Sequence, residues 1–140
     1  MAGYSQTMMH LELAPGPLWN TPTSGDGHQL KDYIDRLKLY LDRGITGVVT
    51  YNAPTAALLL RACVALGVRV PKDLSVLSCD YDAILRYTSV PVTSLHLDRV
   101  EMGDIAVGML LQRIENDWAD VPSISVKAKL VEQESVLSLA

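Results

Sequence analysis

The sequence lacks several features that would assign a function at once. Its 12 Lys and Arg residues do not cluster, and 16 Asp and Glu residues bring the net charge to −4. Phosphate binding needs a basic patch, so we do not expect the chain to bind nucleic acid by itself. No run of about 18 apolar residues occurs, and the N-terminus has no signal-peptide pattern. These absences predict a soluble, cytoplasmic protein with no membrane partner.

Cysteine, histidine and catalytic motifs are equally uninformative about chemistry. Cys63 and Cys79 form neither a CxxC pair nor a secreted disulfide framework, so we expect two buried thiols. His10, His28 and His96 show no metal-binding spacing. No dinucleotide fingerprint, P-loop, GxSxG elbow or ordered triad occurs. We therefore expect no metal, no cofactor and no enzymatic activity.

What the sequence does contain is a large apolar fraction for its length. Its 140 residues are 49% hydrophobic, which suits one domain, or part of one, with a sizeable core. No repeat, low-complexity tract or long charge run indicates an internal linker. One compact unit is expected if the chain is complete.

The first third of the chain contains one clear periodic segment. Residues 8–13 (MMHLEL) predict a short strand, and residues 14–27 predict a loop that is long enough, at about 14 residues, to be functional or mobile. From His28 the pattern changes to that of an amphipathic helix ending before Gly44. Its apolar stripe consists of Leu30, Ile34, Leu37 and Leu41.

The middle of the chain determines the fold class. Residues 45–51 (ITGVVTY) and 74–79 (LSVLSC) predict two buried strands, the first covered on both faces. Between them, Pro54 starts a helix whose apolar face is Leu58, Leu59, Ala62 and Leu66 and which Gly67 ends. Strand, helix and strand within about 35 residues predict a right-handed parallel unit. The fold class is therefore α/β.

The last third continues with four further segments. A short helical or turn segment runs to Tyr87, and residues 89–95 extend again around Pro91. An amphipathic helix is predicted from about Arg99 to Asp117, and residues 125–131 alternate as a final strand. We interpret the apolar stripes of all three long helices as packing surfaces.

Two polar residues follow the two buried strands directly. Asn52 and Asp80 occupy the carboxyl edge of the predicted sheet, where open parallel sheets bind ligands. An amide beside a carboxylate suits a sugar, another polyol or a nucleobase. Alternatively, Asn52 caps the next helix, and Asp80 or Asp82 caps the short one. Trp19, in the long loop, either stacks on such a ligand or covers the core.

Tyr51-Asn52 precedes a predicted helix, the run VPKDLSV stands at residues 70–76, and Asp80 follows the next strand. In this pattern the chain resembles the effector domain of the LacI/GalR family of bacterial transcription regulators. The similarity spans residues 44–135, about two-thirds of the chain. Its other specific parts are the runs PVTS at 91–94 and Met102-Gly103. Together, their order and spacing make a specific pattern.

The resemblance implies a fold and a set of site residues. The fold is a parallel-sheet, three-layer lobe of the periplasmic-binding-protein-like (type I) fold. Asn52 and Asp80 match positions that hydrogen-bond the effector in the family, and Trp19 loosely matches an aromatic residue that packs on it. In the family, the ligand closes two lobes and thereby changes the spacing of the DNA-binding heads.

The resemblance also implies which part of a regulator this is. Residues 1–140 match the C-terminal part of the effector-binding and dimerisation domain, without the N-terminal lobe or the head that contacts operator DNA. The expected partners are a small sugar-like or nucleobase-like effector and a second copy of the chain. The helix at about residues 99–117 packs on the lobe that is not in this sequence, so we expect its Met102, Ile105 and Met109 face to be bare and to drive self-association or helix swapping.

The sequence departs from the family pattern at the site. The departures are Ala53 for an Asp, Ser78-Cys79 for a Gly-aromatic pair, Tyr81 for a second acid, Leu97 for a polar contact and Gln133 for an Arg. They leave the chemistry of the effector open, so the resemblance does not imply one of the familiar sugars. Two alternatives stay open: a periplasmic sugar-binding protein of a transporter, which shares the fold, and an effector lobe joined to a GntR-type head.

Overall fold

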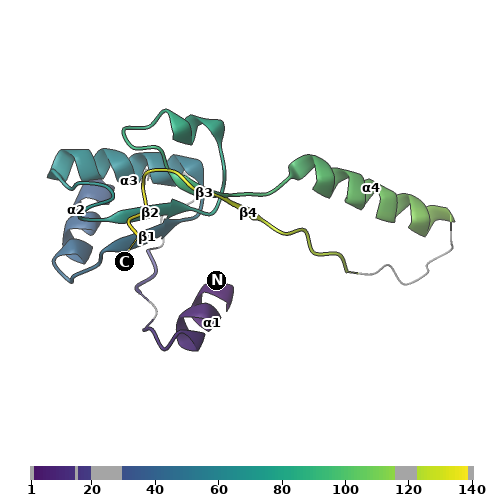
Figure 1. The fold of residues 1–140 in the computed structure, drawn as a ribbon, viewed down its shortest axis with the longest axis horizontal. Helices are drawn as coiled ribbons and strands as arrows, with labels where there is room; N and C mark the ends of the chain where they lie inside the picture. The colour runs from purple at the N-terminus through teal and green to yellow at the C-terminus, as the bar shows by residue number, and fades with distance from the viewer. Residues whose placement is uncertain (1, 15, 20–29, 116–122, 139–140) are drawn as a thin grey trace.

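The computed structural model describes residues 2–14, 16–19, 30–115 and 123–138 (Figure 1). An α/β body carries two helices that stand apart from it. The elements in chain order are α1 (Ala2–His10), α2 (Leu30–Leu41), β1 (Gly47–Thr50), α3 (Ala53–Leu66), β2 (Ser75–Ser78), the 3-10 helix η1 (Ala83–Arg86), β3 (Thr93–His96), α4 (Arg99–Glu115) and β4 (Lys129–Val131).

The sheet is mostly parallel, which confirms the predicted α/β class. Its strand order is β1-β2-β3-β4. Gly47 to Thr50 of β1 pair in parallel with Ser75 to Ser78 of β2, and β3 continues the parallel pairing beside β2. Only β4 runs antiparallel, against β3. The carboxyl ends of β1, β2 and β3 therefore meet at one edge of the sheet.

Helix α3 lies against one face of this sheet, and α2 packs on α3 to complete the core. Tyr33 and Leu37 of α2 are buried, and α3 buries six side chains, among them Leu59 and Leu60. The apolar stripes predicted for these two helices are therefore packing surfaces, as expected. Gly67 ends α3 in the left-handed conformation, at φ 69°, which costs glycine little because it has no Cβ.

The opposite face of the sheet is less covered than the sequence predicted. Val49 of β1 is 55% exposed, whereas its neighbour Val48 packs against the buried core. Among the described helices, only α3 packs against strands at all. The prediction that β1 is covered on both faces is therefore wrong. A continuous apolar run does not distinguish a strand buried twice from one with an open apolar face.

The C-terminal segment returns to the middle of the sheet and ties two strands together. The hydroxyl of Ser135, which is fully buried, donates to the carbonyl of Val76 and accepts from the N–H of Thr93 at 2.9 Å. The Ser135 carbonyl accepts from the Val76 N–H at 2.8 Å. This residue satisfies buried backbone groups where β2 and β3 are not paired directly.

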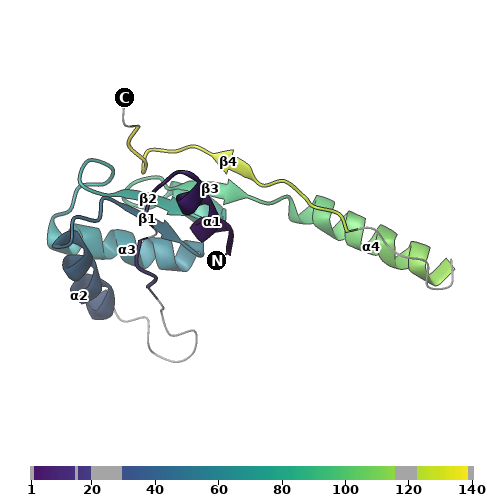
Figure 2. The same cartoon turned by 90° about the horizontal axis from the view of Figure 1, so that it is seen from below.

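Helix α4 projects away from the body, as Figures 1 and 2 show from two directions. It has no buried residue and contacts none of the other described helices or strands. At 17 residues it is about 25 Å long. One compact unit was expected of a complete chain, and α4 departs from that arrangement here. Of the face expected to be bare, Met102 is 43% exposed, whereas Ile105 and Met109 are half-buried.

Three smaller expectations also differ from the structure. Residues 8–13 complete α1 and a turn instead of forming a strand, because their N–H groups bond locally, as from Leu11 to Thr7. The final strand begins only at Lys129, and residues 116–117 of the predicted long helix lie outside the described residues. Cys63 is buried as expected, but Cys79 is exposed because it lies past the end of β2.

No helix in the described ranges is both long and apolar enough to cross a membrane.

Candidate functional site

The parallel register brings the two predicted site residues to the same edge of the sheet. Thr50 and Ser78 are partners in neighbouring strands, and Asn52 and Asp80 each follow their strand by two residues. The N–H of Cys79 donates to the Thr50 carbonyl at 2.8 Å, so the pairing continues past the strand ends. The structure therefore places Asn52 and Asp80 at the same edge of the sheet, as the sequence predicted, and their contact with a ligand stays a prediction.

Asn52 caps α3 with one half of its amide. Its Oδ1 accepts hydrogen bonds from the N–H of Thr55 at 3.0 Å and from the Thr55 hydroxyl at 2.7 Å. The alternative reading of this residue as a helix cap is therefore correct. The other half, the Nδ2 amino group, has no acceptor among the described residues. One side chain can thus fix the start of α3 and still present two donors at the edge.

Asp80 is held by its backbone and paired by its side chain. The buried hydroxyl of Ser78 donates to the Asp80 carbonyl at 2.8 Å and fixes the turn after β2. Asp80 Oδ1 accepts from Arg99 Nη2 at 2.8 Å, across 19 residues of sequence. The Asp80 side chain is 39% exposed and that of Arg99 is 75% exposed, so the pair lies at the surface. Oδ2 of Asp80 has no donor in the described part of the chain.

A second group of polar side chains lies next to Asp80. The ring of Tyr81 meets the ring of His96 edge-on at 5.0 Å, and the Arg86 guanidinium lies 5.7 Å from the centre of the same tyrosine ring. His96 is the last residue of β3, so three neighbouring strand ends contribute to this edge. We call the set Asn52, Asp80, Tyr81, Arg86, His96 and Arg99 the polar edge.

Two further acids near the polar edge accept hydrogen bonds from the backbone N–H groups at the start of a helix. Asp82 caps η1 by accepting from the N–H of Ile84 at 3.0 Å. Asp98 caps α4, and hydrogen bonds from the backbone N–H of Glu101 and of Val100 lower its pKa below the ordinary value, with His96 and Lys129 adding positive charge. These carboxylates serve helix termini.

The sequence did not single out Arg99, and His96 was considered only as a possible metal ligand. The signal for both was their position, because they lie at and just past the end of a third parallel strand. No cluster of three or more potential metal ligands occurs among the described residues.

Trp19 lies against the helical layer. Its ring centre is 4.9 Å from that of Tyr33 and 5.9 Å from that of Tyr40, both on α2, and the side chain packs against the core. These contacts match the reading in which Trp19 covers the core. Its stacking on a ligand stays a prediction, since the ring contacts of the described structure do not join it to Asn52 or Asp80.

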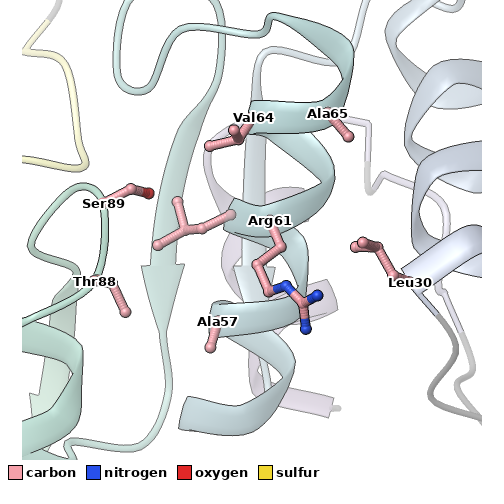
Figure 3. A pocket seen from close by; sticks show the side chains of 8 residues that line it. Leu30, Ala57, Arg61, Val64, Ala65, Thr88 and Ser89 are labelled. Atoms are coloured by element: carbon pink, nitrogen blue, oxygen red, sulfur yellow. The ribbon is translucent and has the colours of Figure 1, made fainter.

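A hollow of about 400 Å³ lies along α3, away from the polar edge (Figure 3). Leu30 of α2 borders it on one side, and Thr88 and Ser89 from the loop after η1 border it on the other. Ala57, Leu60, Arg61, Val64 and Ala65 of α3 form its floor. Arg61 is the one charged residue of this lining, so the hollow offers little of the hydrogen bonding that a polyol requires.

The fold is an α/β domain with a mostly parallel sheet, and its hydrogen-bonding groups lie at the carboxyl edge, where open sheets of this kind bind ligands. The profile of the periplasmic binding protein-like domain matches residues 1–136, and the chain belongs to that family. The resemblance to LacI/GalR regulators is confirmed by similar known proteins. The HTH-type transcriptional repressor PurR of Photorhabdus laumondii subsp. laumondii is 42% identical over 72 residues, which are 51% of this chain and 21% of the relative.

Two solved structures share the fold over nearly the whole chain. A LacI family regulator from Enterococcus faecium with bound ribose gives a TM-score of 0.75 at 20% identity, over 99% of this chain and 51% of that one. The lac repressor dimer bound to operator and an anti-inducer gives 0.81 at 20% identity, over 98% and 46%. The chain thus spans about half the length of these structures and matches about a fifth of the curated relative.

Proposed function

We propose that this chain is the C-terminal part of the effector-binding and dimerisation domain of a LacI-type transcription regulator. It binds a small ligand with hydroxyl or amide groups at the polar edge, and ligand binding modulates operator binding by the full regulator. The observation that carries the proposal is that Asn52 and Asp80 each lie two residues past the paired Thr50 and Ser78, at one sheet edge, and that Nδ2 of Asn52 and Oδ2 of Asp80 have no described protein partner.

The comparisons support a regulator more than a transport protein. The similar proteins described above are repressors and LacI-family regulators, and none is an enzyme or a transporter component. The net charge of −4 supports placing operator contacts in a separate head domain. The bare face of α4 supports a second lobe or a second copy as its cover, because monomeric proteins rarely expose a large apolar patch.

A thermal-shift screen tests the ligand part of this proposal. The full chain is heated with neutral sugars, sugar acids, sugar phosphates and nucleobases, because a ligand at 100 times its dissociation constant adds about 2.7 kcal/mol to stability. We expect a hit that Asp80→Ala abolishes. Asp35→Ala, an exposed acid on α2, is the control with the same change of charge and should keep the hit.

Two results would contradict the proposal. If no compound of these classes shifts the transition, the polar edge is not an effector site of this kind. If a hit persists unchanged in Asp80→Ala, the ligand binds elsewhere on the chain.

A further inference from the structure

We propose that Arg99 contacts the effector directly and that the effector is an acidic polyol, a molecule with several hydroxyls and one carboxylate or phosphate. This inference rests on the proposed function, because it names the ligand class for the same polar edge. The residue sits at the first position of α4, beside the end of β2, and no sequence motif pointed to it.

The ion pair between Arg99 and Asp80 leaves hydrogen-bonding groups unused on both side chains, so a ligand can bind to the two residues together. Only Nη2 of the guanidinium bonds, and only to Oδ1 of the carboxylate. A guanidinium has five N–H donors in a planar fork, and a carboxylate has two acceptor oxygens. The remaining donors of Arg99 and Oδ2 of Asp80 find no described protein partner. A ligand can therefore accept from one residue and donate to the other at the same place.

Basic side chains close to this pair can meet a negative group on the ligand. Arg86 and His96 both contact Tyr81, the residue after Asp80, so three basic side chains gather at the polar edge. Of the nearby acids, Asp82 and Asp98 are committed to the N-termini of η1 and α4. Both carboxylates keep their negative charge, but their hydrogen bonds to the helix starts are already made, so Asp80 is the acid of this edge whose Oδ2 has no described donor.

The two halves of the pair select different parts of such a ligand. A carboxylate or phosphate matches the planar fork of Arg99 and forms short, charge-assisted hydrogen bonds with it. Hydroxyl groups of the same molecule donate to Asp80 Oδ2 and accept from Asn52 Nδ2. A neutral sugar satisfies the second set of groups but leaves the fork without an anionic partner.

A role in folding is the competing explanation, and it makes a different prediction. A solvent-exposed ion pair contributes little to stability. With 75% of its side chain exposed, Arg99 is expected to be almost silent in unfolding experiments. Its loss should therefore appear in ligand binding and leave the thermal transition of the ligand-free chain nearly unchanged.

The test is calorimetric titration of the full chain with matched pairs of ligands. The pairs are galactose with galacturonate, for the carboxylate, and ribose with ribose 5-phosphate, for the phosphate. The variants are Arg99→Gln, which removes the charge, Arg99→Lys, which keeps the charge without the fork, and Asp80→Ala. Arg36→Gln, an exposed arginine on α2, is the control with the same change of charge.

We expect the acidic member of one pair to bind more tightly than its neutral partner, by on the order of ten- to a hundred-fold. Arg99→Gln should remove most of that preference and change neutral-sugar binding little, Arg99→Lys should restore part of it, and Arg36→Gln should resemble the wild type. Rising salt should weaken the preference. The pair that shows it identifies carboxylate or phosphate as the anionic group.

Two outcomes overturn the inference and can be told apart. If neutral and acidic members bind equally and Arg99→Gln changes neither, the acidic ligand class is wrong while the effector site at Asp80 stands. If no member of either pair binds, or if Asp80→Ala leaves binding intact, the inference fails together with the proposed function.

Discussion

The amide of Asn52 performs two separable tasks, and two substitutions at this position should separate them. Its Oδ1 caps α3, whereas its Nδ2 is free at the polar edge. Asn52→Asp keeps an acceptor for Thr55 and removes both donors. Asn52→Ala removes the acceptor and the donors together. We therefore expect the first variant to lose ligand binding only, and the second to lose ligand binding and stability.

The expected loss of stability follows from the geometry of the cap. Replacing a capping Asn by Ala costs about 0.5–2 kcal/mol, and Asp caps about as well as Asn. Oδ1 serves both the N–H and the hydroxyl of Thr55, and α3 buries six side chains, so its first turn cannot separate from the core at low cost. We predict a loss of about 1–2 kcal/mol for Asn52→Ala, roughly 3–10 °C in Tm at this chain length. Asn52→Asp should stay within about 0.5 kcal/mol of the wild type.

Urea unfolding followed by far-ultraviolet circular dichroism measures the first effect. The midpoint of Asn52→Ala should fall while the slope of free energy against urea stays constant. Titration with the ligand found in the screen measures the second effect. If Asn52→Asp is as unstable as Asn52→Ala, the Oδ1 cap is not what stabilises α3. If Asn52→Asp binds ligand as the wild type does, Nδ2 is not a ligand donor.

Three further predictions concern other parts of the chain. Burial raises the pKa of Cys63 to about 11, so a maleimide at neutral pH should label the exposed Cys79 alone until urea is added; equal labelling of both would contradict the packing of α3. Hydrogen bonds from the Arg69 side chain lower the pKa of Asp73 from 3.8 to about 2, so the stability from this pair is complete above about pH 4 and is lost as the pH falls toward 2. A carboxyl titration by NMR should show this value and its return toward normal in Arg69→Gln. Finally, sedimentation over a wide concentration range should show self-association that Met102→Lys weakens; a monomer at every concentration would refute association through α4.

The sequence predicted the central helices and strands and their ends, because the patterns that indicate them are local. The four-three-four spacing of Leu30, Ile34, Leu37 and Leu41 reports a helix from one stretch of chain, and the structure has α2 there. Gly67 ends α3 as expected, because its φ of 69° suits glycine. The place of Asn52 and Asp80 followed from the same reasoning, since a polar residue directly after each of two parallel strands must lie at their common edge.

Errors arose where a local pattern has two tertiary solutions. An apolar run such as MMHLEL forms a strand only beside another strand, and without that neighbour residues 8–13 complete a helix and a turn. The stripe on α4 resembles those on α2 and α3, yet no described element packs on it. Local periodicity indicates that a face is apolar, and it does not indicate which partner covers that face.

The sequence by itself therefore determined the α/β class, the order of its central elements and the strand ends that carry the polar edge. Only the tertiary structure decided that Arg99 meets Asp80 at 2.8 Å, that one half of the Asn52 amide is used by Thr55, and that Ser135 joins β2 to β3. The physical reason is the separation along the sequence between the residues that interact. Helix periods, caps and strand ends are set by residues within a few positions of one another, whereas contacts across 19 or 59 residues exist only after the sheet register has brought distant segments together.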